Sequence, residues 1–184
     1  MKSVAAPRLE SLIYNHQMWN TTFPLTWSFH RVDTSADAFG MLRSSIDLLG
    51  ERDALQQRME EDEYLFLPQY LDRDEVKGAR LATCQKLASQ GLLDLNHPVI
   101  DGIAATEVET GFKGDLTEDN PPLMNLLYAG RMIEFYEMFL GGPVRHYDYT
   151  WFRVKGPGMG TYAHCDVVYM GRGTPRLFTS WTLC

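Results

Sequence analysis

One stretch predicts the fold and the chemistry of this chain: Thr161-Tyr162-Ala163-His164-Cys165-Asp166-Val167-Val168-Tyr169-Met170. Its Val, Tyr and Thr content favours a β-strand, in which residues i and i+2 project from the same face. The His164 imidazole and the Asp166 carboxylate would then point into one space, whereas a helix would turn them apart. Such a pair is the first half of the two-histidine, one-carboxylate arrangement that holds non-haem iron with open positions.

The regions on both sides of this stretch also have strand and turn patterns. Residues 155–160 and 171–175 are rich in glycine and proline, which predicts a turn at each place. Residues 177–183 read as a following strand, and residues 144–154 read as a preceding strand with alternating character. The alternation places five residues on one face of the preceding strand: Arg145, Tyr147, Tyr149, Trp151 and Arg153. Together these segments predict an antiparallel β unit.

Helical patterns come before this β unit. Asp72 is predicted to be an N-cap, because Glu75 stands three residues later in a capping-box arrangement. The helix that it opens is expected to run to Gln90, with Gly91 after its end. A broad apolar face predicts a second long helix over residues 122–140. Weaker patterns predict helices over residues 34–50 and 54–61, a short strand over residues 64–68, and a loop with one or two short strands over residues 92–121.

Composition narrows the class of protein. The chain has 184 residues, is 45% hydrophobic and 22% charged, and so is expected to be globular. A net charge of -7 argues against nucleic acid or an anionic membrane surface as the main partner. No stretch is long enough for a membrane span, and no secretory signal is recognised. Three cysteines without pairing or zinc-type spacing favour a reducing compartment, read here as the cytoplasm.

Several motifs follow one another between residues 60 and 182. The first are Glu61-Asp62-Glu63-Tyr64-Leu65-Phe66-Leu67-Pro68 and Leu71-Asp72-Arg73-Asp74-Glu75-Val76. After them come the predicted helix ending near Leu140, the predicted strand over residues 145–153, a Gly-Pro-Gly turn, the His164-Cys165-Asp166 stretch and Thr179-Ser180-Trp181-Thr182. In these motifs and in their order, residues 60–182 resemble the phytanoyl-CoA dioxygenase-like family. Residues 1–58 are outside the resemblance and are taken as an N-terminal helical extension of a domain over residues 59–184.

The resemblance implies an α+β fold, with N-terminal helices packed on an incomplete double-stranded β-helix, a jelly-roll or cupin-like barrel. It also implies a non-haem Fe(II), 2-oxoglutarate-dependent dioxygenase that hydroxylates a small organic substrate and converts 2-oxoglutarate to succinate and carbon dioxide. His164 and Asp166 match two iron ligands. Tyr149, Arg153 and Trp181 match positions that line the 2-oxoglutarate pocket. From the residues alone, Arg153 can equally be a surface cation and Trp181 a core aromatic residue.

The chain also departs from the family pattern. In that family, a second iron-binding histidine lies several strands downstream, and the arginine that pairs with 2-oxoglutarate lies beyond it. No histidine follows His164 in this chain, so the second histidine and the arginine beyond it are both missing. The sequence stops at Cys184, where the family barrel is half built, as expected for a truncated form. With these ligands missing, we expect weak Fe(II) binding and a chain that is inactive alone. We also expect a half-built barrel to leave unpaired strand edges. The other histidines are read as packing or turn residues rather than ligands: His16, His30, His97 and His146.

Two alternatives stay open at this point. A non-catalytic relative can use its helical half as an interaction module, in which case the folded chain binds no metal. A cupin-type barrel can use His164 and Asp166 with another divalent metal, in which case metal binding persists without 2-oxoglutarate binding. Substrate identity and oligomeric state do not follow from the sequence.

Overall fold

The computed structural model describes residues 26–27, 30–31, 33, 35, 37–38, 40–105, 111–147, 149–154, 164–174 and 176–182. Contacts within the chain group it into two units, Met1–Met41 and Leu42–Cys184. In the first unit, β1 (Thr26–Trp27) pairs with β2 (His30–Arg31) in antiparallel register. The predicted boundary after residue 58 stays a prediction.

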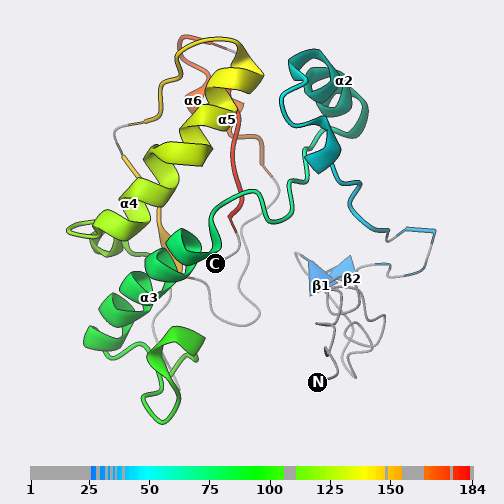
Figure 1. The fold of residues 1–184 in the computed structure, drawn as a ribbon. Helices are drawn as coiled ribbons and strands as arrows, with labels where there is room; N and C mark the ends of the chain where they lie inside the picture. Colours follow the sequence, from blue (N-terminus) through cyan, green and yellow to red (C-terminus); the bar gives the residue numbers. More distant parts are fainter. Residues whose placement is uncertain are drawn as a thin grey trace, which may run out of the picture. The chain divides into compact units, whose positions relative to one another are not determined.

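The described part of the second unit is mostly helical (Figure 1). Its four longer helices are α2 (Arg52–Asp62), α3 (Arg73–Ser89), α4 (Pro121–Tyr128) and α5 (Gly130–Leu140). The shorter helical elements are η2 (Ile46–Leu48), η3 (Val99–Asp101), η4 (Gly114–Leu116) and α6 (Val167–Met170). β3 (Gly111–Phe112) and β4 (Arg153–Val154) form one antiparallel pair of two residues each. None of these described helices is both long and apolar enough to cross a membrane.

The predicted α+β fold with a double-stranded β-helix is wrong. The described residues form no barrel and no sheet beyond the two pairs of two-residue strands. In the described part of residues 144–154, only Arg153 and Val154 enter a ladder, and the side chains of Tyr147 and Trp151 are 44% and 43% exposed. An alternating pattern becomes a sheet only where a neighbouring strand pairs with it and a second layer covers one face. Among the described residues of this segment, only Arg153 and Val154 have a paired neighbour, so the pattern does not extend into a sheet.

The stretch containing the His-Cys-Asp motif is also not a strand. Residues 161–163 lie outside the described part of the chain. After them, Asp166 has helical backbone angles and its carbonyl oxygen accepts a hydrogen bond from the Met170 N–H at 2.9 Å. The β-branched pair Val167 and Val168 favours a strand only when a sheet is present to hold it, and a single helical turn forms instead.

The predicted cap of α3 is confirmed. The Asp72 side chain accepts hydrogen bonds from the backbone N–H groups of Asp74 and Glu75, at 2.9 Å and 3.1 Å. These two groups would otherwise lack partners in the first turn. Gly91 follows the helix with a φ of 72°, as the sequence predicts. Local chemistry alone therefore determines both ends of this helix.

Removing the Asp72 cap is expected to lower the midpoint of thermal unfolding, since Asp72→Ala leaves both N–H groups without an acceptor. Asp72→Asn should retain most of the stability, because its side-chain oxygen accepts the same bonds. Hydrogen bonds from the N–H groups of Glu75 and Asp74 lower the pKa of Asp72 below its ordinary value of 3.8. The ionised cap therefore stabilises the fold fully above about pH 4, and this contribution is lost as pH falls through the lowered pKa.

Circular dichroism melts of the wild type and both variants at neutral and acidic pH check this expectation. The wild type should lose its advantage over Asp72→Asn as the pH falls, because Asn does not titrate. An Asp72→Ala variant that melts with the wild type at neutral pH would contradict the role of the cap.

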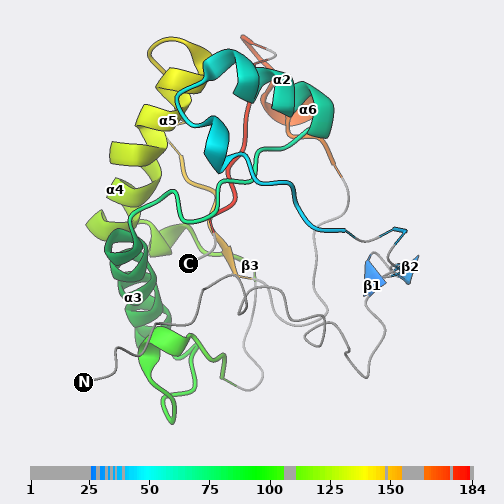
Figure 2. The same cartoon turned by 45° about the vertical axis from the view of Figure 1, so that its right-hand side comes forward.

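The prediction of a single helix over residues 122–140 is wrong in one respect: the structure has two helices there, α4 and α5. Ala129 between them has an extended backbone, with φ of -144° and ψ of -179°, and Gly130 has a φ of 50°. A positive φ is readily adopted only by glycine, so Gly130 permits the break. Figure 2 shows α5 following α4 at this point. The apolar face that spans both helices concealed the interruption.

Two apolar clusters hold the second unit together. The first packs Leu55 of α2 against Phe135 and Phe139 of α5, and the second packs Ala79 of α3 against two leucines of α4, Leu123 and Leu126. Burying a large apolar side chain contributes about 1.5–3 kcal/mol. The predicted helix over residues 54–61 thus exists as α2, although it buries Leu55 completely and is not purely a solvent-facing helix.

Two weaker predictions fail in the same region. Residues 40–45 are not helical, and the expected helix over residues 34–50 is reduced to η2 in the described residues. Thr34, Ala36 and Phe39 of that prediction lie outside the described residues. The strand expected over residues 64–68 is reduced to Phe66, which forms a single parallel bridge with Ser44. The two segments are joined by the Ser45 N–H donating to the Phe66 carbonyl oxygen and by the Arg43 N–H donating to the Tyr64 hydroxyl oxygen, each at 2.8 Å.

Candidate metal site

The His164 and Asp166 side chains lie together at the start of α6. The distance between His164 Nε2 and Asp166 Oδ1 is 3.3 Å, and the two side chains are 38% and 36% exposed. The strand that was expected to bring them together is absent. His164 lies before the helical turn, and Asp166 is the N-cap residue of that turn. Because the two residues are not both inside a helix, the helical geometry that would turn their side chains apart does not apply.

The pair lies in an open hollow of about 490 Å³. One wall comes from the chain leading into α6, and the other comes from the segment over residues 176–182. The residues that line the hollow are His164, Cys165, Asp166, Val167, Leu177, Thr179 and Trp181. Residues 177, 179 and 181 alternate along the second wall, which places every second side chain of this segment at the hollow.

The intervening residues 176, 178 and 180 attach the same segment to α5, beside which it runs (Figures 1 and 2, red). The contacts are the Arg176 guanidinium donating to the Leu140 carbonyl oxygen at 2.9 Å, the Phe178 ring packing edge-to-face on Phe139, and the Ser180 hydroxyl bonding Tyr136. Burial raises the pKa of Tyr136, so its hydroxyl stays protonated and can donate to Ser180. The predicted strand over residues 177–183 forms no ladder in its described part, yet its alternation persists and positions the hollow.

Thr179 orients the Asp166 carboxylate. The Thr179 hydroxyl donates a hydrogen bond to Asp166 Oδ2 at 2.9 Å, while the other oxygen, Oδ1, faces His164. Such partners hold a metal-binding carboxylate in one orientation. Thr179 was not among the residues predicted for the site. Its position two residues before Trp181 was the signal that could have identified it.

The geometry fits two neighbouring ligands of one metal ion. Ligand atoms about 2.1 Å from an ion and at right angles to each other are separated by about 3 Å. The distance of 3.3 Å between His164 Nε2 and Asp166 Oδ1 is close to that ligand–ligand separation. Within the described residues, no group of three or more His, Cys, Asp or Glu side chains is arranged to hold a metal. His164 and Asp166 are therefore the two candidate ligands that the described residues bring together.

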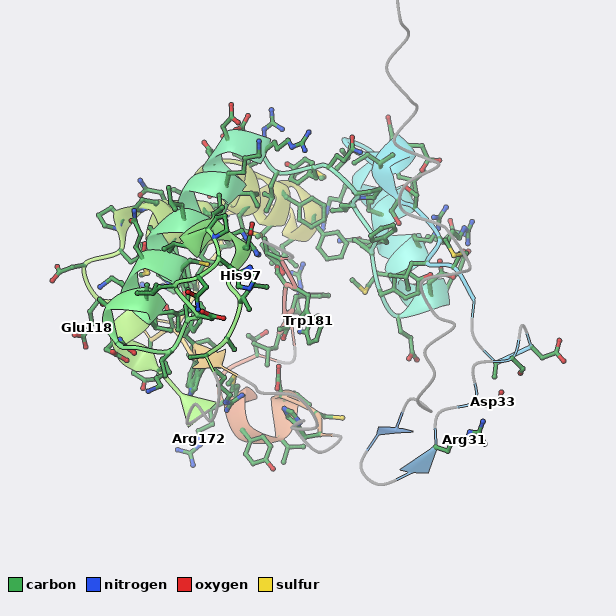
Figure 3. All side chains as sticks on the ribbon, turned by 90° about the horizontal axis from the view of Figure 1, so that it is seen from below. Arg31, Asp33, His97, Glu118, Arg172 and Trp181 are labelled. Carbon is green, nitrogen blue, oxygen red and sulfur yellow. The ribbon has the colours of Figure 1, made fainter. Side chains whose placement is uncertain are left out.

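The structure brings only one of the three predicted 2-oxoglutarate residues to this hollow. Trp181 lines it and is 92% exposed, on the C-terminal segment seen in Figure 3. The Tyr149 ring packs edge-to-face on Trp151, with ring centroids 5.1 Å apart, and Arg153 belongs to β4. Neither Tyr149 nor Arg153 lines the hollow. The predicted face of alternating residues does not form because the strand that would carry it does not form.

The other histidines lie elsewhere or are not described. The His146 ring packs on Tyr128, with centroids 4.2 Å apart, and does not line the hollow. His97 is exposed and lies 3.9 Å from an Asp94 carboxylate oxygen. His16 and the side chain of His30 are outside the described part of the structure.

Comparison with known proteins identifies no relative. No protein-family model, no curated protein and no solved structure matches this chain. The resemblance noted in the sequence therefore stands as a hypothesis, and assignment of a function depends on the geometry of the hollow.

Proposed function

We propose that this chain carries the His–Asp half of a non-haem Fe(II) site in a 2-oxoglutarate-dependent dioxygenase acting on a small organic substrate. The observation that carries the proposal is the 3.3 Å separation of His164 Nε2 and Asp166 Oδ1, with Thr179 bonded to the opposite carboxylate oxygen. The resemblance to the phytanoyl-CoA dioxygenase-like family supports the same chemistry. The predicted barrel, which the structure contradicts, does not support this proposal.

Fe(II), when bound, supplies dioxygen activation coupled to the conversion of 2-oxoglutarate to succinate and carbon dioxide. His164 would contribute a neutral imidazole nitrogen, and Asp166 a carboxylate oxygen of opposite charge to the metal. Thr179 would keep that carboxylate from rotating. Leu177 and Val167 give the hollow apolar walls, which favour an apolar part of a substrate over water. The remaining metal ligands would have to come from residues outside the described part of the chain, from 2-oxoglutarate or from water.

Anaerobic titration of the 184-residue chain with Fe(II), and with Co(II) as a spectroscopic probe, tests the proposal. We expect d–d absorption bands of bound Co(II) that are lost in His164→Ala and kept in His146→Ala, the matched control outside the hollow. Addition of 2-oxoglutarate should change these bands by occupying open metal positions. A folded His164→Ala variant that binds Co(II) like the wild type would refute the assignment.

Thr179 provides a second variant pair for the same titration. Thr179→Val removes the hydroxyl with little change in shape and should weaken Co(II) binding by about 10–100-fold. Thr179→Ser retains the hydroxyl and should bind within a few-fold of the wild type. Equal affinity of the Val and Ser variants would show that the hydrogen bond to Asp166 does not position the ligand.

A non-catalytic interaction module is the second candidate. The observation favouring it is that, among the described residues, no group of three or more His, Cys, Asp or Glu side chains is arranged to hold a metal ion. A folded wild-type chain that shows neither Co(II) bands nor 2-oxoglutarate binding would support this candidate.

A small-molecule partner and a cytoplasmic location belong to the first proposal, the dioxygenase. The location is supported by Cys84 and Cys165, which are both free.

A further inference from the structure

An exposed aromatic cluster lies in the segment between α5 and α6, and it consists of Tyr147, Tyr149 and Trp151. Although this segment forms no long strand, the three rings meet one another. Trp151 is edge-to-face with both tyrosines, at centroid distances of 5.6 Å to Tyr147 and 5.1 Å to Tyr149. The three side chains are 44%, 51% and 43% exposed. Contiguous exposed apolar surface of this kind marks an interaction site more often than scattered apolar residues do.

The neighbouring residues fix the aromatic cluster on the helical core. The Thr150 hydroxyl is hydrogen-bonded to the Tyr128 hydroxyl of α4 at 2.7 Å, and Phe152 packs against the apolar residues of α3 and α4. The Tyr147 hydroxyl donates to the Met170 carbonyl oxygen at the end of α6, at 2.8 Å. A partner would therefore meet rings that are already held in place, which lowers the entropy cost of binding.

The charge around the aromatic cluster is opposite to that of the whole chain. Residues 141–184 contain five arginine and lysine residues and two aspartates, although the chain has a net charge of -7. Arg145 and Arg153 each lie two residues from the cluster, so their Cα atoms are within about 7 Å of those of Tyr147 and Trp151. Both arginines are exposed, and neither forms an ion pair with a carboxylate of the described residues. The surroundings of the cluster therefore favour an acidic partner.

The residue types are those that dominate the binding energy of protein interfaces. Trp, Tyr and Arg are enriched at binding hot spots, whereas Lys, Glu and Asp are depleted in interfaces. A single-stranded nucleic acid would also combine planar rings with negative charge. The net charge of -7 repels such a long polyanion, whereas a short acidic segment needs contact only with the local arginines. These observations favour a protein segment over a nucleic acid.

We propose that the aromatic cluster is a docking surface for an acidic segment of a partner protein. Apolar anchor side chains of that segment would pack on Tyr149 and Trp151, and its carboxylates would pair with Arg145 and Arg153. The proposal goes beyond the dioxygenase function and is independent of it, because none of the three cluster residues lines the hollow of the candidate metal site.

Fluorescence anisotropy of labelled nonapeptides with the full chain tests the proposal. The probe has three Glu-Glu-Tyr repeats, and its counterparts have Glu-Glu-Ser repeats, without anchors, or Gln-Gln-Tyr repeats, without charge. We expect the probe to bind at least about tenfold more tightly than either counterpart. Trp151→Ala should weaken its binding at least about tenfold, whereas Trp151→Phe should retain most of it. Trp181→Ala is the matched control, because Trp181 is more exposed and lines the metal-site hollow instead.

Arg145→Gln provides a second test, which does not depend on removing a ring. It should weaken binding of the probe about threefold in dilute buffer and by less at high salt, because salt screens an exposed charge. Arg73→Gln, the same change at an exposed position of α3, should leave binding unchanged. This pair of variants decides the question if Trp151→Ala does not fold.

Several results would overturn the proposal and leave the Co(II) titration unaffected. The first two are equal binding of the probe and its counterparts, and equal effects of the variants and their controls. Tighter binding of a labelled 20-nucleotide oligothymidylate than of the probe would identify a nucleic acid as the partner instead. Sedimentation velocity tests a second copy of this chain: self-association of the wild type that is lost in Trp151→Ala would make that copy the occupant.

Discussion

Phe139→Ala is expected to destabilise the second unit by about 3–5 kcal/mol, the largest effect of any substitution considered. Phe139 is 2% exposed and lies in the cluster between α5 and α2. Its ring stacks on Phe135 at 5.7 Å and meets Phe178 edge-to-face at 5.2 Å. Truncation removes all of these contacts and leaves a cavity that the two helices cannot fully close.

The same substitution should also weaken metal binding. Phe178 is the residue before Thr179, so loss of its contact with Phe139 loosens the segment that orients the Asp166 carboxylate. Urea unfolding followed by circular dichroism measures the first effect, and the Co(II) titration at a temperature where the variant is folded measures the second. Phe139→Leu retains most of the volume and should lose below about 2 kcal/mol.

Leu81→Ala provides the matched surface control, because Leu81 is 38% exposed and lies on α3, away from this cluster. It should change stability much less than Phe139→Ala and leave Co(II) affinity unchanged. A Phe139→Ala chain as stable as the Leu81→Ala chain would contradict the assignment of the core. Unchanged Co(II) affinity in Phe139→Ala would contradict the coupling between this core and the hollow.

Asn120→Ala is expected to lower the free energy of unfolding by about 2–3 kcal/mol, because one buried side chain satisfies two backbone groups. Asn120 is 2% exposed. Its Oδ1 accepts the Leu123 N–H at 3.3 Å, which caps α4, and its Nδ2 donates to the Leu116 carbonyl oxygen at 2.9 Å. Alanine leaves both backbone groups without these partners, inside a region where water cannot easily replace them.

Two further variants separate the contributions of Asn120. Asn120→Ser keeps a capping oxygen but loses the donor to Leu116, so it should fall between the wild type and the alanine variant. Thr83→Val removes the second acceptor of Nδ2, which lies at 3.4 Å, and should have a small effect because that bond is long. Urea unfolding at neutral pH measures all three. A loss in Thr83→Val as large as that in Asn120→Ala would contradict this division.

The sequence predicted those elements whose ends are determined by local chemistry. Asp72 caps α3 with its own side chain, and Gly91 follows the helix, so no distant contact was needed to place either end. α2 was placed within two residues for a related reason, namely a run of residues that favour helices. Its burial of Leu55 depends on Phe135 and Phe139, which are far away in the sequence and gave no local signal.

The sequence failed where a strand depended on a partner. Tyr147, Tyr149 and Trp151 alternate as strand residues do, but no neighbouring strand pairs with them in the described structure. Val167 and Val168 favour a strand by intrinsic preference and form a helical turn instead. The His164 and Asp166 side chains lie 3.3 Å apart in the structure, but the strand alternation that was expected to bring them together is absent. The metal that they were predicted to bind stays a prediction.

The alternation of residues 176–182 between α5 and the hollow has a consequence for how this chain tolerates mutation. Residues 176, 178 and 180 are held by the helix, whereas residues 177, 179 and 181 line the hollow. In a saturation library, substitutions at the even positions should reduce the amount of folded protein. Substitutions at the odd positions should leave abundance nearly unchanged and alter binding. We therefore expect residues 179 and 181, which are exposed, to be the positions of this segment where substitution alters binding with the least loss of folded protein.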